Sequence, residues 1–142
     1  MKPHSGFSLL EVMLVLVLAA LLMGVVATSL SEGPVLRKSA REVAASLRHA
    51  RSVAILRQTP MTWSMDTGNK TFWSGSDQSQ RRELHASITP KLNTAASEVS
   101  GATGSIRFFP DGSSTGGSVE LEANEQSFKV NVEWITGRVS IL

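Results

Sequence analysis

The feature that most restricts the fold of this chain is an apolar run from Phe7 to Ala27, in which Glu11 is the only charged residue. A helix rises about 1.5 Å per residue, so a helix over this run would span about 30 Å, the thickness of the hydrocarbon core of a bilayer. We therefore predict that it crosses a membrane once. Lys2 is the only Lys or Arg ahead of the run, which favours a cytoplasmic N-terminus and places the rest of the chain outside the cytoplasm.

The next segment has the pattern of an amphipathic helix. Gly33-Pro34 comes first, and because Pro34 has no N–H to donate, we expect a kink, a frayed turn or a restart of the helix there. From Val35 to Gln58, apolar residues then recur at spacings of three and four, which predicts a helix with one buried face. That face consists of Leu36, Ala40, Val43, Ala44, Leu47, Ala50 and Ala54.

After Pro60 the apolar period changes to two, which predicts β-strands. Residues 61–65 alternate, residues 66–69 have the composition of a turn, and the chain returns through residues 72–73, so we predict a β-hairpin. The side chains expected on its buried face are Met61, Trp63 and Met65.

The remaining strands are predicted with unequal clarity. Residues 74–104 are rich in Ser, Gln, Thr and Ala, and we expect one strand around Leu84 to Ile88 within a surface loop. The C-terminal 38 residues predict a strand in SIRFFPDG, a hairpin formed by SVELEA and SFKVNV, and a last short strand after Gly137. The apolar face of the second hairpin strand is expected to consist of Phe128, Val130, Val132 and Trp134.

These elements predict an α+β fold in which a long N-terminal helix packs its second half on an antiparallel sheet. The chain has 142 residues, which is enough for one small domain beside the apolar segment. It contains no cysteine, so neither a disulfide framework nor a Cys-based metal site supports the fold. The formal net charge is +2, but residues 1–58 carry seven Lys and Arg against three Asp and Glu, whereas residues 59–142 carry seven against nine. The basic character therefore belongs to the N-terminal part of the chain.

The sequence does not predict a catalytic, metal or cofactor site, and we expect no enzyme activity. Ser114 lies in a G-x-S-x-G pattern at residues 112–116, but a hydrolase elbow needs a strand, a turn and a helix, and here a predicted strand follows. Asp111 alone is too weak a signal for calcium, since no second Asp lies in its loop. The three histidines belong to different parts of the chain and form no set, and the three tryptophans are expected in or near the core rather than as a stacking platform. These residues are His4, His49, His85, Trp63, Trp73 and Trp134.

The N-terminal sequence GFSLLEVMLVLVLAALL resembles the class III signal of type IV pilin-like proteins. The resemblance implies that a prepilin peptidase cuts after Gly6, that the new N-terminal Phe7 is N-methylated, and that Glu11, the fifth residue of the mature chain, acts in assembly. The segments ARSVAILRQTPMTW, RFFPDGSSTGG and VEWITGRV are similar to the H-type minor pseudopilins of type II secretion, the GspH family, and to the broader group that this family shares with FimT-like minor pilins.

The resemblance implies a type IV pilin-like fold and a division into a leader (residues 1–6), a transmembrane and assembly helix (7–28) and a periplasmic α+β domain (29–142). It further implies a bacterial inner-membrane protein with a single span. As a subunit near the tip of the periplasmic pseudopilus, it would assemble with other major and minor pseudopilins and support the export of folded proteins across the outer membrane.

Two alternatives compete with this interpretation. A secretory signal peptide could end at the small residues before Thr28, but an acid early in the apolar run has no use in such a peptide. A FimT-like minor pilin that binds DNA or primes pilus assembly is favoured by the Arg-rich helix face and by Arg138. The negative charge of the predicted sheet half argues against nucleic acid as a partner.

Glu11 has two explanations of its own. In the mature chain the α-amino group of Phe7 is protonated near neutral pH, and pairing with it, within one subunit or between subunits, would offset the cost of burying the carboxylate. Pairing between subunits would select the register of the filament. Alternatively, Glu11 extends back to the cytoplasmic headgroups, since it lies only about one turn into the apolar segment.

Overall fold

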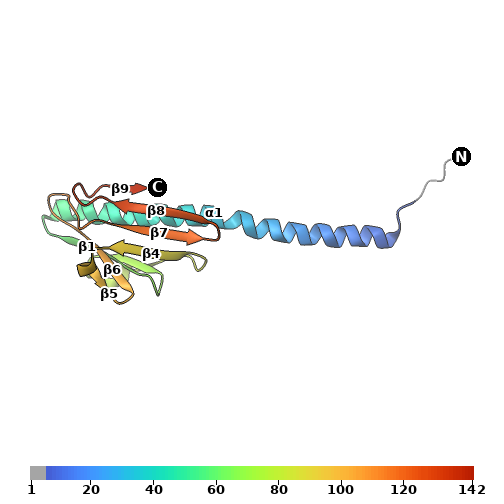
Figure 1. Cartoon of the computed structure of the whole chain (residues 1–142), viewed down its shortest axis with the longest axis horizontal. Helices are drawn as coiled ribbons and strands as arrows, with labels where there is room; N and C mark the ends of the chain where they lie inside the picture. Colours follow the sequence, from blue (N-terminus) through green and yellow to red (C-terminus); the bar gives the residue numbers. More distant parts are fainter. Residues whose placement is uncertain (1–5) are drawn as a thin grey trace. The chain divides into compact units, whose positions relative to one another are not determined.

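The computed structural model describes residues 6–142, apart from the side chains of residues 25–32 and 78, and it falls into two compact units, residues 1–32 and residues 33–142. Residues 1–5 of the predicted leader therefore lie outside the described residues. The order of elements is one α-helix followed by nine strands and two short 3₁₀ helices (Figure 1). The α+β prediction is confirmed.

The helix α1 (Leu9–Arg57) is 49 residues long and contains Pro34 in its interior. Of the kink, frayed turn or restart predicted at Gly33-Pro34, the frayed turn and the restart are wrong, because the helix is assigned without interruption across these residues. A Pro inside a helix removes one hydrogen bond and costs about 3 kcal/mol. The burial of the apolar stripe that begins two residues later, at Leu36, offsets this cost.

Membrane crossing was predicted for residues 7–28. The side chains of this segment are described only as far as residue 24, and the next described side chains begin at residue 33. Within the described residues, no helix combines the length and the apolar character that a membrane span requires.

Two antiparallel sheets follow the helix where one was predicted. The first has the strand order β3-β2-β1-β6-β5 and the second the order β4-β7-β8-β9, and Figure 1 shows β7 and β8 beside the C-terminal half of α1. The bounds in the first sheet are β1 (Met61–Asp66), β2 (Thr71–Ser74), β3 (Arg82–Glu83), β5 (Val99–Ser100) and β6 (Thr103–Phe108). Those in the second are β4 (Thr89–Thr94), β7 (Gly117–Ala123), β8 (Gln126–Val132) and β9 (Val139–Ile141).

The predicted buried face of the helix forms the centre of the core. All seven stripe residues are at most 1% exposed, and Trp63, Met65, Ile106, Val119 and Val130 from the two sheets are fully buried with them. Four of the seven are alanines, which let strands approach the helix closely. Polar contacts fix the helix to both sheets: Trp63 Nε1 donates to Ser46 Oγ at 2.7 Å, and Arg48 Nη2 donates to the carbonyl of Val139 at 3.2 Å.

The two sheets come closest where β6 passes β4. Thr94 Oγ1 donates to the carbonyl of Ser105 at 2.6 Å, and a Cβ placed on Gly104 would overlap the side chain of Leu92. A side chain at this position would displace the side chain of Leu92, so the glycine favours the close approach of β6 to β4.

The predicted hairpin at residues 61–73 is confirmed, with Trp63 paired to Ser74 and Asp66 paired to Thr71. Its turn is stabilised by Asp66, whose carboxylate accepts the backbone N–H of Asn69 at 2.9 Å and its side-chain amide at 2.7 Å. The backbone N–H of Asn69 and then its amide lower the pKa of Asp66.

Three predictions in the sheet region are wrong. Residues 84–88 are not a strand, although Leu84 and Ile88 are buried, and the segment 74–104 is not one loop, since it contains β3, β4, β5 and the helices η1 (Gln78–Gln80) and η2 (Ala96–Glu98). Trp134 does not lie on the apolar face of β8, because that strand ends at Val132 and the tryptophan is 66% exposed.

Candidate functional site

The beginning of α1 contains the predicted site residues Gly6, Phe7 and Glu11. Ser8 precedes the first helical residue and caps the helix: its Oγ accepts the N–H of Leu10 at 3.2 Å, and its carbonyl accepts the N–H of Glu11 at 3.0 Å. Capping satisfies backbone donors that have no partner inside the first turn. The helix therefore starts two residues after the predicted cleavage junction.

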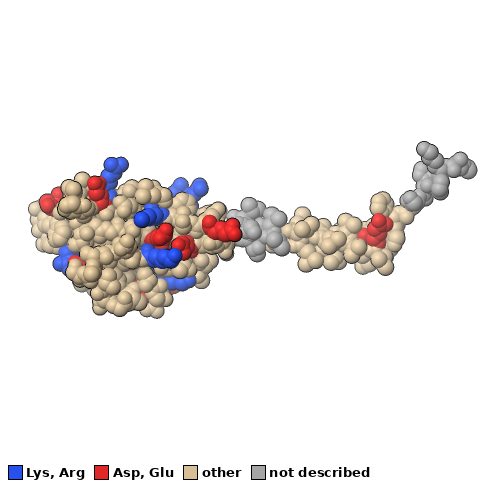
Figure 2. Space-filling model, in the orientation of Figure 1, with Lys and Arg blue, Asp and Glu red and all other residues tan. Residues whose placement is uncertain are grey.

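Glu11 lies in this first turn, where the positive end of the helix dipole favours a carboxylate. The residues around it are apolar and exposed: Phe7 and Leu9 are 80% exposed and Leu10 is 75% exposed. Figure 2 shows the drawn part of this segment in tan with one acidic group and no basic group. The chain thus presents a single carboxylate on an apolar surface, an arrangement that suits a cation brought by another molecule or by the processed N-terminus.

Ser8 belongs to this site but was not predicted as part of it. The signal was present, because Ser8 and Glu11 have the S-x-x-E spacing of a capping box just before a hydrophobic run. Ser8 fixes where the helix begins, so it places Glu11 in the first helical turn, while Phe7 lies just before the helix.

The loops that contain the PDG and ITG sequences bind the helix. Arg51 Nε donates to the carbonyls of Gly112 and Thr136, both at 3.1 Å, and a Cβ on Gly137, whose φ is +63°, would overlap the Gly112 carbonyl. Asp111 Oδ1 accepts the hydroxyl of Ser113 at 2.6 Å and its N–H at 3.0 Å. These motifs therefore hold two loops against α1.

Ser114, from the G-x-S-x-G pattern, is buried, and its Oγ accepts the N–H of Gly116 at 2.9 Å. The strand β7 begins at Gly117, so the strand, turn and helix of a hydrolase elbow are not formed here.

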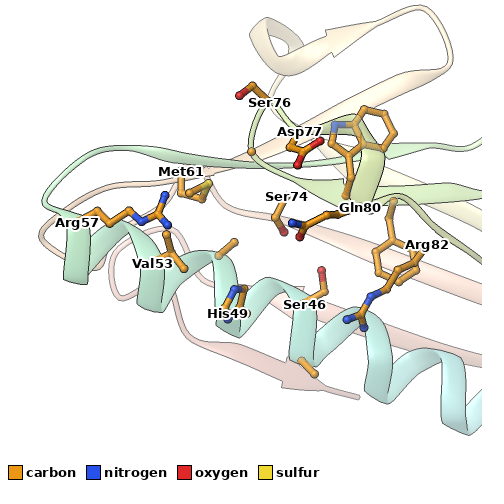
Figure 3. Close-up of a pocket in the computed structure, with 15 residues that line it drawn as sticks. Ser46, His49, Val53, Arg57, Met61, Ser74, Ser76, Asp77, Gln80 and Arg82 are labelled. Carbon is orange, nitrogen blue, oxygen red and sulfur yellow. The ribbon is translucent and has the colours of Figure 1, made fainter.

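A groove of about 630 Å³ lies between α1 and β2. Figure 3 shows Ser46, His49 and Val53 on its helix side and Ser76 and Asp77 on the opposite side. Asp77 Oδ1 accepts the hydroxyl of Ser79 at 2.6 Å, and that hydroxyl lowers the pKa of Asp77. Ser46 is already bonded to Trp63. Among the described residues that line the groove, no hydrogen bond joins a nucleophile to a base.

The remaining candidates do not form a metal site. His49 and His85 lie in different elements, and His4 lies outside the described residues. Over residues 6–142, as far as their side chains are described, no group of three or more His, Asp and Glu could hold a metal ion.

Comparisons with known proteins match both parts of the chain. The family model described as Type II transport protein GspH matches residues 39–137, and the model of the prokaryotic N-terminal methylation motif matches residues 1–27. A protein named Type II secretion system protein H, from Xanthomonas campestris pv. campestris, is 35% identical over 143 aligned positions, which cover 97% of this chain and 83% of that protein.

Two solved structures share the fold. The type IV minor pilin FimU of Pseudomonas aeruginosa aligns with a TM-score of 0.61 at 18% identity, over 79% of this chain and 91% of that chain. The minor pseudopilin EpsH from the type 2 secretion system of Vibrio cholerae aligns with a TM-score of 0.60 at 11% identity, over 75% of this chain and 95% of that chain. The pilin-like α+β fold predicted from the sequence is confirmed.

Proposed function

The chain belongs to the GspH family of type II transport proteins, and from this premise we propose that it is a minor pseudopilin of type II protein secretion with a structural, non-enzymatic role. In this proposal it sits near the tip of the periplasmic pseudopilus, assembles with other major and minor pseudopilins, and supports the export of folded proteins across the outer membrane. The observation that carries the proposal is the presence in one chain of a methylation motif, at residues 1–27, followed by a GspH region, at residues 39–137.

Processing follows from the same motif. A prepilin peptidase would cut between Gly6 and Phe7, and Phe7 would then be N-methylated. Mass spectrometry of the membrane form is expected to find a mature chain that starts at methylated Phe7. A chain that starts at Thr28 would contradict the proposal and identify a secretory signal peptide instead.

Residues 7–28 would anchor the chain in the inner membrane with a single span, and residues 29–142 would form the periplasmic domain. The apolar surface of the described part of this segment supports the proposal, since Leu9, Met13 and Met23 are 62–80% exposed and would be covered by lipid before assembly.

Glu11 would pair with the α-amino group of Phe7 in a neighbouring subunit. Burial of an unpaired ion is costly, so the pairing stabilises only the register in which the two groups meet. A chain that keeps its leader has no amine at this position and would be excluded. The competing explanation, in which Glu11 reaches the cytoplasmic headgroups, predicts no dependence of assembly on the carboxylate.

A FimT-like minor pilin that binds DNA or primes pilus assembly is the second candidate, and the basic residues of α1 favour it. A salt-dependent gel shift with the full chain separates the two functions. Micromolar binding to duplex DNA that weakens steeply with salt would favour the second candidate, whereas the secretion proposal predicts no such binding.

A further inference from the structure

A second groove, of about 610 Å³, opens at the beginning of the unit that comprises residues 33–142. The groove is lined by residues from the first turns of α1 after Gly33, from β3 and from β8. Pro34, Ala45 and Phe128 supply its apolar surface. Its basic side chains are Arg37, Lys38, Arg41 and Arg82.

The charge of this groove is almost entirely positive. Among the residues whose side chains are described, Glu42 is the one carboxylate that lines it, 3.9 Å from Lys38 Nζ, with side chains that are 78% exposed for Lys38 and 43% for Glu42. Such an exposed pair neutralises little. Among the described residues the other ion pairs join Lys91 to Glu122 and Arg107 to Glu98, so none involves the three arginines of the groove.

Arg37 and Arg41 also differ from the next two arginines of α1. Arg48 and Arg51 donate to backbone carbonyls and hold strands and loops in place. Arg37 and Arg41 are exposed, and no hydrogen bond to the rest of the domain is found for them in the part of the chain that the structure describes. Their guanidinium groups are therefore available for a ligand.

The position of the groove in the chain indicates which ligand. Residues 29–32 alone separate Gly33, where the groove begins, from Thr28, the end of the membrane segment in the proposed function on which this inference rests. Before assembly, so short a connection keeps the groove near the surface of the bilayer. Basic residues close to a bilayer are attracted to the headgroups of anionic lipids.

We propose that this groove binds the headgroup of an anionic phospholipid in the membrane that holds the chain. Arg37 and Arg41 suit the phosphate, because a guanidinium donates two parallel hydrogen bonds to an oxyanion. Lys38 and Arg82 add charge at the rim, and Pro34 and Phe128 contact the glycerol and the upper acyl chain. The lipid would hold the domain at the membrane until a neighbouring subunit replaces it.

The experiment uses the full chain in nanodiscs that contain equal amounts of phosphatidylglycerol and phosphatidylcholine, with retained lipids counted by native mass spectrometry. The wild type is compared with Arg37→Gln/Arg41→Gln and with a matched control, Lys129→Gln/Arg138→Gln, which removes two exposed charges outside the groove. We expect the wild type and the control to retain phosphatidylglycerol roughly tenfold over phosphatidylcholine, and the groove variant to show little preference.

Equal preference in the groove variant and the wild type would overturn the inference, and so would an equal loss in both double variants. The inference would also be overturned if the lipid preference of the groove variant is unchanged but the variant no longer binds a second pseudopilin or duplex DNA. The groove would then be the binding site of that partner. Failure of every variant to enter nanodiscs would contradict the membrane segment of the proposed function, whereas entry without any lipid preference would contradict only this inference.

Discussion

The two parts of α1 differ in where their apolar side chains find partners. In residues 6–24 the large apolar side chains are 47–80% exposed, whereas in residues 36–54 the stripe residues are at most 1% exposed. Composition explains the contrast. The first part is apolar on every side, and the second has basic and polar residues on the face opposite its stripe.

This contrast shows that one helix is built for two environments. The apolar stripe of the second part is buried by strands of the same chain, so its residues must fit the shape of the two sheets. The first part needs lipid or other subunits to cover it, so its residues need only match the length and polarity of those surroundings. Glu11 is the exception, because burying a charge in such a surface is costly unless a partner or the headgroup region accommodates it.

The largest effect is expected for Glu11→Leu, which removes the one charged side chain of the first part. Loss of the carboxylate would leave the amine of a neighbouring subunit unpaired, at a cost of about 3–5 kcal/mol, while insertion into the membrane becomes more favourable. Cysteine cross-linking between adjacent pseudopilins, and secretion, should both fall at matched membrane levels.

Glu11→Asp provides the control for charge, since it keeps the carboxylate but shortens its reach. We expect cross-linking in this variant to lie between that of the wild type and that of Glu11→Leu. Unchanged cross-linking and secretion in Glu11→Leu would contradict the pairing and support the explanation in which the carboxylate extends to the headgroups.

The next effect compares the same substitution in the two parts of the helix. Leu47→Ala leaves a cavity in the core and should lower the free energy of unfolding by about 2–5 kcal/mol. Leu14→Ala, at a position that is 56% exposed, should change it by less than about 0.5 kcal/mol. Urea unfolding of the full chain in mild detergent, followed by tryptophan fluorescence, to which the buried Trp63 and Trp73 contribute, measures both. Equal losses would show that residue 14 contributes to the folded domain.

The sequence predicted the elements whose burial is periodic and missed those whose burial is not. The stripe from Leu36 to Ala54 was predicted completely, because seven small or apolar residues repeat on one helical face. The strand β4 was missed because its sequence, TPKLNT, contains residues that rarely form strands. It is an edge strand, where Pro90 needs no hydrogen-bonded N–H.

Other errors came from residues whose partners are distant in the sequence. Leu84 and Ile88 are buried anchors of a loop, and local pattern cannot distinguish them from a strand. Arg51 belongs to the Arg-rich face of the predicted helix, for which no contact within the chain was predicted, yet it binds the carbonyls of Gly112 and Thr136, more than 60 residues away. No local signal predicts such a contact. The candidate site at Gly6, Phe7 and Glu11 could be predicted from the sequence because its residues lie close together along the chain.

Arg51→Met tests that contact and should have a smaller effect than Leu47→Ala. It leaves two backbone carbonyls without their donor, for an expected loss of about 1–3 kcal/mol in the free energy of unfolding. Arg41→Met is the matched control, because Arg41 is exposed and has no such bond among the described residues, and it should stay within about 0.5 kcal/mol of the wild type. Similar losses in the two variants would mean that Arg51 contributes only its charge.

The smallest effect concerns the carboxylates that the domain, unlike the apolar segment, holds with its own backbone. The hydroxyl and then the N–H of Ser113 lower the pKa of Asp111, and both bonds form only in the folded state. Because the folded pKa lies below the unfolded one, the stabilisation is complete above the unfolded value, near 4, and is lost as the pH falls through the folded value.

Asp111→Asn should therefore lower the urea midpoint at pH 7, and the difference from the wild type should vanish near pH 2. Ser113→Ala removes the hydroxyl that donates to Asp111 and should likewise reduce the pH dependence of the urea midpoint. A difference for Asp111→Asn that persists at low pH would show that the side chain stabilises the loop by its shape rather than by its charge.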